Sequence, residues 1–181
     1  MVSDAARDST SESVLPAVED FSPEQRELYE KLPLDLTRGL LLTRSSAGPY
    51  LSLGQSFHHG WLPAALRELI ILRVAALTHC EYERFHHVPL ALACGVPREV
   101  IDATLAGSEH VGTHELNAAM AFVDHLVAGI TGEPPKRDVL RQYFSTGEIA
   151  EITLLVGHYL MTSVFVSALG ITPERRRAAN E

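Results

Sequence analysis

The sequence predicts an all-α fold, and three features of its pattern indicate this class. Apolar residues recur at helical spacing through most of the 181 residues, as expected of helices that bury one face. Ser, Thr and Pro stand where helices would begin, and Gly stands where they would end. No run shows the strict alternation of polar and apolar side chains typical of a half-buried strand. We therefore expect one compact helical domain.

The chain length fits a single domain with a substantial core. Residues 1–20 are rich in Ser, Asp, Glu and Ala and are expected to be disordered. The domain should span residues 21–172, and the charged end at 173–181 should fray. The first residues, MVSDAARDSTSES, are polar and acidic, so we expect no signal peptide.

Helix-start and helix-stop residues define the elements of the first part. Ser22 and Pro23 are suited to the cap and first position of a helix, and Gly60 suits a helix end. The expected elements are a helix from Ser22 to about Pro33, a short helix at 36–42, a turn at 45–49, and a helix at 50–59.

A buried helix is expected from Pro63 to Leu77, because residues 66–77 are apolar almost all round. A second helix should follow at 81–94, started by a capping box between Thr78 and Glu81. Pro89 lies inside this helix, so a kink or break is expected just after His87.

The second half predicts four more helices, at 97–106, 113–129, 138–144 and 148–169, with loops at 107–112 and 132–135. The last helix approaches membrane-spanning length but contains Gly157, His158 and several hydroxyl residues. We therefore expect it to be buried or to face another copy of the chain, and not to cross a membrane.

Residues with chemical potential gather at the start of the 81–94 helix. Cys80, Glu83 and His87 fall at i, i+3 and i+7, so they would share one face, whereas His86 points to the side. Glu83 and His87 could form a hydrogen-bonded pair that orients the imidazole. Cys80 would lie in the first turn, where the helix end favours a thiolate.

The run RELIILRVAAL, followed by Cys80, Tyr82–Glu83, His86–His87 and Gly95–Val96, resembles the carboxymuconolactone decarboxylase family, which includes the alkylhydroperoxidase D proteins. The alkylhydroperoxidase branch has a glutamate, then Cys-x-x-Cys, then a histidine four residues on. The matching positions here are Glu68, Cys80, Glu83 and His87. Glu83 replaces the second cysteine, so the dithiol needed for peroxidase chemistry is missing. The resemblance implies an alkylhydroperoxidase D-like helical fold and a homo-oligomer.

Two candidate residues keep alternative interpretations. Glu68 should point inward, where it could pair with Arg73 or another Arg, or could have the raised pKa of a general acid–base group. Cys80 could be a nucleophile or proton donor, or a small buried packing residue. Cys94 has no polar neighbours in sequence and should only pack.

Further residues could contact a substrate or a metal. We expect substrate contacts from His86, Tyr82, His58 and His158, although His158 could instead make a core hydrogen bond. A metal site would draw on His79, Cys80, Glu83, His86 and His87. These five side chains would point over more than half of the helix circumference, so we expect no metal and no other cofactor.

Composition limits the remaining partners and the cell compartment. A net charge of −8 argues against nucleic acid or an anionic membrane as a partner. Cys80 and Cys94 are too far apart along one helix to bond, so a reducing cytoplasm is expected.

The function that the resemblance implies is a cofactor-independent lyase, a decarboxylase acting on a small organic acid or lactone. His87 would donate or accept the proton, Glu83 would orient it or act as base, and Glu68 would relay protons. Three alternatives remain: an isomerase or cyclase acting on a larger metabolite, a thiol-based antioxidant protein, and a non-catalytic oligomeric binding module.

Overall fold

The computed structural model describes residues 14–129, 138 and 140–174, and every regular element in that part of the chain is helical. The expected all-α class is therefore confirmed. The α-helices are α1 (Pro23–Lys31), α2 (Asp35–Leu40), α3 (Ala47–Ser56), α4 (Ala64–Leu77), α5 (Glu81–Ala93), α6 (Arg98–Leu105), α7 (His114–Ala128) and α8 (Thr146–Ala168). Short 3-10 helices lie at Val18–Asp20, Phe57–His59 and Leu140–Gln142.

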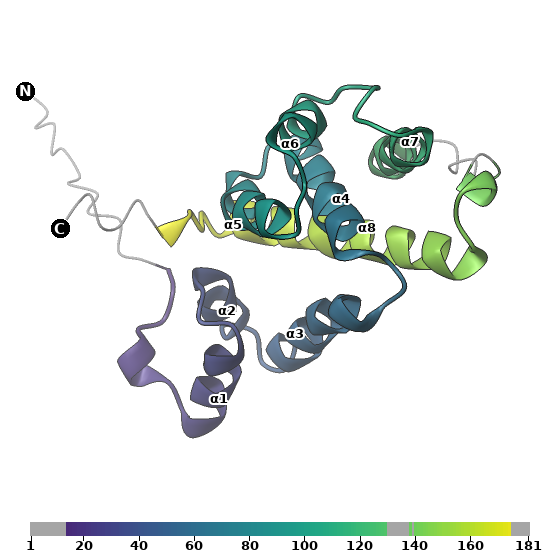
Figure 1. Cartoon of the computed structure of the whole chain (residues 1–181). Coiled ribbons are helices and arrows are strands. Elements are labelled where there is room, and N and C mark those ends of the chain that lie inside the picture. Colours follow the sequence, from purple (N-terminus) through teal and green to yellow (C-terminus); the bar gives the residue numbers. More distant parts are fainter. Residues whose placement is uncertain (1–13, 130–137, 139, 175–181) are drawn as a thin grey trace, which may run out of the picture.

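Helices α4 and α8 form the centre of the molecule. Figure 1 shows α8 running the length of the domain, with α4–α7 on one side and α1–α3 on the other. Helix α4 packs against α5, α6, α7 and α8, which is why nearly all of its faces are apolar. Ile70 and Leu72 of α4 and Ile152 of α8 are completely buried. This packing fixes the positions of α4, α5 and α8, which carry the site.

The predicted helix starts are largely present. Ser22 caps α1 in a full capping box with Gln25, and Thr113 caps α7. Helix α8 begins at Thr146, earlier than expected, because Ser145 and Glu148 form a capping box. These caps satisfy amide groups that have no partner within the helix.

The capping box predicted between Thr78 and Glu81 is wrong. Thr78 ends α4, and its hydroxyl donates to the Val74 carbonyl at 2.8 Å. His79 then adopts a left-handed backbone with φ of 52°, the conformation that commonly follows a helix end. Cys80 is the cap residue of α5 and has extended backbone angles. His79 and Cys80 therefore belong to the turn between α4 and α5, and not to the second helix as a cap at Thr78 would require.

Two prolines are better tolerated than the sequence suggests. Helix α3 begins at Ala47, inside the expected turn, because Pro49 occupies its first turn, where no amide hydrogen bond is lost. Helix α5 continues through Pro89 to Ala93, so the expected break is absent. Val88 and Ala91 pack against the core on either side of Pro89 and hold the two halves together.

The described ends of the chain are attached to the domain. Arg38 donates from Nε to the Pro16 carbonyl at 3.0 Å, although residues 1–20 were expected to be disordered. Glu174, in the segment expected to fray, accepts a hydrogen bond from the Asp35 amide at 3.0 Å. Residues 1–13, the 132–135 loop and residues 175–181 lie outside the described residues. Of the helix expected at 138–144, the structure describes only the 3-10 turn at Leu140–Gln142.

Helix α8 meets the length and composition of a membrane-spanning segment, with a mean hydropathy of 1.6 in its most apolar window. Within this domain 44% of that window is buried, and the helix packs against α4, α5 and α7. Its hydrophobicity is thus partly used in the core.

Candidate active site

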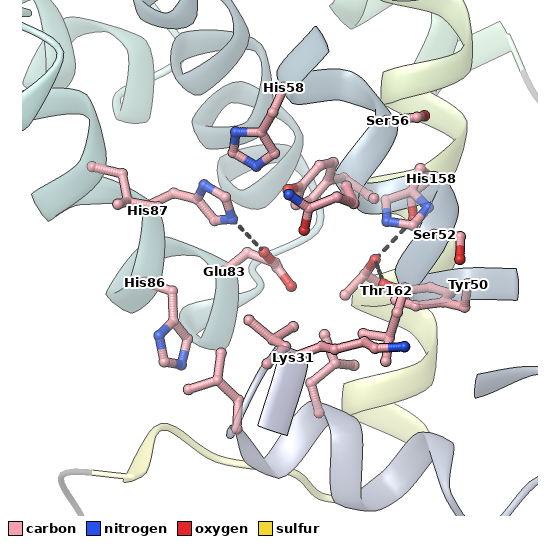
Figure 2. A pocket seen from close by; sticks show the side chains of 18 of the residues that line it. Lys31, Tyr50, Ser52, Ser56, His58, Glu83, His86, His87, His158 and Thr162 are labelled. Atoms are coloured by element: carbon pink, nitrogen blue, oxygen red, sulfur yellow. Dashed lines mark hydrogen bonds and ion pairs between the residues drawn. The ribbon is translucent and has the colours of Figure 1, made fainter. Parts of the chain in front are cut away.

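A pocket of about 890 Å³ opens between α1, α3, α5 and α8. Leucines form much of its wall: Leu28, Leu32, Leu34, Leu36, Leu51 and Leu90. Polar side chains gather on two opposite sides of it. In Figure 2, Glu83, His87 and His58 lie on one side, and Tyr50, Thr162 and His158 lie on the other.

Glu83 and His87 form the pair that their spacing predicts. They are one turn apart on α5, and Glu83 Oε2 lies 3.2 Å from His87 Nε2. Both side chains line the pocket, and Glu83 is only 3% exposed. The carboxylate can therefore meet a ligand in a nearly dry setting, while the imidazole holds it in place.

Glu68 supports His87 from behind the pocket wall. It points inward from α4, as expected, and is 1% exposed. Its Oε2 lies 2.7 Å from His87 Nδ1, and its Oε1 accepts from Arg67 Nη2 at 3.3 Å. The expected ion pair with Arg73 is wrong, because Arg73 points to α7 and donates from Nε to Asp124 at 2.6 Å. The other expectation, an ion pair between Glu68 and a different arginine, is confirmed, and that arginine is Arg67.

These contacts decide the protonation of the group. Burial lowers the pKa of His87, but hydrogen bonds and charges from Glu68 and Glu83 outweigh burial and raise that pKa to about 9. Burial raises the pKa of Glu68, yet His87 and Arg67 outweigh this effect and leave the pKa below its ordinary value. The alternative of a raised Glu68 pKa is therefore wrong. At neutral pH His87 is therefore an imidazolium ion held by the Glu68 carboxylate, and its other nitrogen faces Glu83.

Cys80 does not join this group. It borders a separate cavity of about 220 Å³, together with Thr78 and Ser163. As the cap residue it precedes the helix, so helical spacing does not place it in line with His87. Burial raises the pKa of its thiol, so the expected thiolate is wrong. The structure thus favours the interpretation of Cys80 as a buried, protonated side chain. Cys94 is exposed, and the expectation that it packs is wrong.

All four residues predicted to contact a substrate line the pocket: Tyr82, His86, His58 and His158. Burial and the neighbouring Arg67 lower the pKa of His58, so this imidazole is neutral at neutral pH. Burial likewise lowers the pKa of His158. His86 Nε2 lies 3.0 Å from Glu174 Oε2, so His86 is tied to the C-terminal segment.

The sequence interpretation missed Tyr50 and Thr162, which also line the pocket. Tyr50 and Thr162 share a short hydrogen bond, and burial raises the pKa of the Tyr50 phenol. Thr162 could have been found, since it lies one helical turn after His158. Tyr50 gave no signal, because its partners come from the far end of the chain.

Among the described residues, no group of three or more His, Cys, Asp or Glu side chains could hold a metal ion. The five residues considered above diverge: Cys80 borders the small cavity, and His86 is paired with Glu174.

Comparison with known proteins shows which family and which folds the chain resembles. Residues 52–125, which carry Glu68, Glu83 and His87, match the carboxymuconolactone decarboxylase family. No curated protein sequence shows significant similarity. The match covers 74 of the 181 residues, so this part of the chain is similar to that family.

Two solved structures share the fold. One is a protein of unknown function from Agrobacterium tumefaciens, suggested to be the antioxidant defence protein AhpD. It has a TM-score of 0.66 and 19% identity, covering 73% of this chain and 92% of that one. The other is a cysteine-to-alanine variant of the debrominase Bmp8 in complex with 2,3,4-tribromopyrrole. It has a TM-score of 0.74 and 17% identity, covering 95% of this chain and 97% of that one. At 19% and 17% identity, these two likenesses show a shared fold.

Proposed function

We propose that this protein is a cofactor-independent lyase that decarboxylates a small organic acid or lactone by acid–base chemistry. The observation that carries the proposal is the row Glu68–His87–Glu83, which ends in the pocket. His87 lies 2.7 Å from the buried carboxylate and 3.2 Å from the pocket carboxylate. Such a row can hold a proton and deliver it to one side of a ligand.

The protonation state suits decarboxylation. Loss of carbon dioxide leaves the electron pair of the broken carbon–carbon bond on the substrate as a carbanion, which must then take up one proton. His87 has a pKa raised to about 9 and therefore holds that proton at neutral pH. Glu83, which lines the pocket, would accept this proton from His87 and pass it to the carbanion, leaving His87 neutral.

A second candidate is a cofactor-free isomerase or cyclase of a larger metabolite, and the pocket dimensions favour it. A cavity of about 890 Å³ with a leucine-rich wall lies toward the upper end of the range for small-molecule sites. In this reaction Glu83 would remove a proton from carbon before returning one elsewhere on the same skeleton. No carbon atom would be lost.

The antioxidant alternative receives less support. Cys80 borders a different cavity from His87, and burial keeps its thiol protonated. The absence of a second cysteine at the Glu83 position removes the dithiol route.

One experiment separates the two candidates. The protein is incubated in deuterium oxide with 4-carboxymuconolactone and related lactone acids, and, in parallel, with neutral lactones and ketones. Decarboxylation should release carbon dioxide and place one deuterium on the product, at the carbon where the resulting carbanion or enolate takes up its proton. If only the neutral compounds react, with every carbon retained and a hydrogen exchanged, the isomerase replaces the lyase.

A further inference from the structure

The pocket has a second polar side that the proposed proton transfer leaves unused. His158, Tyr50 and Thr162 lie across the cavity from Glu83 and His87 (Figure 2). The charge of Glu83 influences the ionisation of both His158 and Tyr50. A ligand in this cavity can therefore meet both sides at once.

His158 is buried without a hydrogen-bond partner for its ring. The residue is 5% exposed, and its Nδ1 is enclosed without a partner. Its Nε2 has no hydrogen bond within the described residues either, but it is not enclosed. Nε2 therefore remains available to a ligand atom in the pocket, because no described residue uses its hydrogen-bonding capacity.

The proton of His158 belongs on Nε2. Burial lowers the pKa of His158, so the ring is neutral and carries one N–H and one lone pair. An enclosed N–H without a partner is rarer in proteins than an acceptor that lacks one. The lone pair therefore lies on Nδ1, and Nε2 presents an N–H to the pocket.

Neighbouring rings hold this donor in place. The ring centroid of Tyr50 lies 4.5 Å from that of His158, and those of Tyr159 and Phe57 lie at 5.3 and 5.5 Å. Thr162 bonds the Tyr50 hydroxyl and donates to the His158 carbonyl at 2.9 Å. The donor thus sits on a rigid wall, as electrostatic stabilisation of a reacting group requires.

Gly54 keeps the space beside Nε2 open. A Cβ at this position would lie 3.3 Å from His158 Nε2 and 3.7 Å from Cε1. Gly54 lines the same pocket and lies in the interior of α3, where glycine is otherwise destabilising relative to alanine. The absence of a side chain at Gly54 leaves room for a ligand atom to reach Nε2.

We propose that His158 Nε2–H binds the carbonyl oxygen of the substrate, and that the reacting carbon of the substrate is next to that carbonyl or conjugated with it. This inference rests on the proposed function and adds the group that stabilises negative charge on the substrate's carbonyl oxygen. When carbon dioxide leaves, or when Glu83 removes a proton, the electron pair forms an enolate whose negative charge lies on the carbonyl oxygen. A neutral N–H at that oxygen stabilises the charge as it develops.

The test uses coumarin labelled with carbon-13 at its carbonyl. Coumarin is a planar lactone that accepts hydrogen bonds, donates none and has no carboxyl group to lose. Its affinity is measured by calorimetry and its carbonyl stretching frequency by difference infrared spectroscopy. In the wild-type protein the carbonyl frequency should fall below its value in hexane, because a hydrogen bond weakens the carbonyl bond.

The variants separate the hydrogen bond from the shape of the pocket. His158→Phe should weaken coumarin binding roughly tenfold and restore the frequency seen in hexane. His158→Gln keeps an N–H and should retain most of the frequency shift. Gly54→Ala crowds Nε2 without changing His158 and should also weaken binding. The exposed His125→Phe and Tyr143→Phe are matched controls and should change neither quantity.

The outcomes are decisive in both directions. No saturable binding of coumarin by the wild type at millimolar concentration would overturn the proposal. The same carbonyl frequency in wild type and in His158→Phe would also overturn it, and so would unchanged affinity in Gly54→Ala should His158→Phe fail to fold. Glu83→Gln should leave the frequency shift intact, so a failure of the acid–base assignment is recognised separately.

Discussion

Glu68 Oε2 and His87 Nδ1 lie 2.7 Å apart although the residues are 19 positions apart in the chain. The contact joins α4 to α5, across the turn at His79. It fixes the ring of His87 so that the opposite nitrogen faces Glu83 on the pocket wall. An inward-facing carboxylate thereby controls the charge of a group that can reach a ligand.

The acid–base assignment predicts a loss of turnover without a loss of fold. Glu83→Gln keeps size and hydrogen bonding but removes the base, and His87→Gln removes the proton store. Each should lower kcat/KM by at least about a hundredfold, since general acid–base groups contribute about a hundred- to ten-thousand-fold. Steady-state kinetics on the substrate found in the deuterium experiment measures this.

Glu81→Gln is the matched control for that experiment, because its side chain is 69% exposed and lies in the first turn of the same helix. It should keep wild-type rates. If both charge-removing variants stay active while Cys80→Ser is dead, a nucleophilic thiol carries the reaction and the roles assigned to Glu83 and His87 are wrong.

Glu68→Gln should lower the pKa of His87. The hydrogen bond and charge of Glu68 are among the causes that raise this pKa to about 9, and an adjacent opposite charge typically contributes about one to three units. Nitrogen-15 NMR titration of the imidazole would follow the change, and the pH above which turnover declines should move down with it. An unchanged titration would show that Glu68 does not set the charge of His87.

The same contacts predict how stability varies with pH. The folded pKa of His87 is raised from 6.5 to about 9, so the stabilisation is full below pH 6.5 and is lost as pH rises through about 9. The folded pKa of Glu68 lies below its ordinary 4.5, so its contribution is full above pH 4.5 and is lost in acid. The excess unfolding free energy of wild type over His87→Gln should therefore be largest between these limits, on the order of a few kcal/mol. Urea unfolding at a series of pH values tests this; a difference that grows above pH 9 would contradict it.

The sequence predicted those features that depend on local spacing. Helix positions followed from caps and apolar periodicity, and the pairing of Glu83 with His87 followed from one turn of helix. Glu68 was placed inward because its position lies in line with the apolar face of α4. A single helix determines these contacts and orientations, so they do not depend on how the helices pack together.

Features set by distant parts of the chain could not be predicted. Arg73 forms an ion pair with Asp124 on α7 only because α4 and α7 pack together. Tyr50 meets Thr162 across a separation of 112 residues. Cys80 was misplaced for a local reason, since it is the cap residue of α5 and its extended backbone takes it out of the helical spacing that would have aligned it with His87.

The cysteines should differ in reactivity in the opposite order to that expected of a catalytic Cys80. Cys94 is exposed, whereas Cys80 is buried with a raised thiol pKa. Because the thiolate is the reactive form, N-ethylmaleimide at neutral pH should modify Cys94 about tenfold faster or more. Peptide mass spectrometry against time measures both rates, and Cys94→Ser confirms the assignment.

Mild peroxide should likewise yield separate oxidation products and no disulfide between Cys80 and Cys94. Rapid peroxide reduction that disappears in Cys80→Ser would overturn this expectation and support the antioxidant alternative.

The exposed face of α8 predicts that the protein is a homo-oligomer. Leu154, Met161 and Val164 lie on this helix with exposed fractions of 54%, 48% and 68%, and the spacings of seven and three residues place them along one stripe. An apolar stripe of this kind on a long helix is stabilised when a second copy covers it.

Light scattering at micromolar concentration should give a mass that is a multiple of 19.8 kDa. Val164→Glu should shift the mass toward the monomer, whereas Leu42→Glu, at a leucine of 50% exposure at the end of α2, should not. A wild-type mass equal to one chain would contradict the prediction.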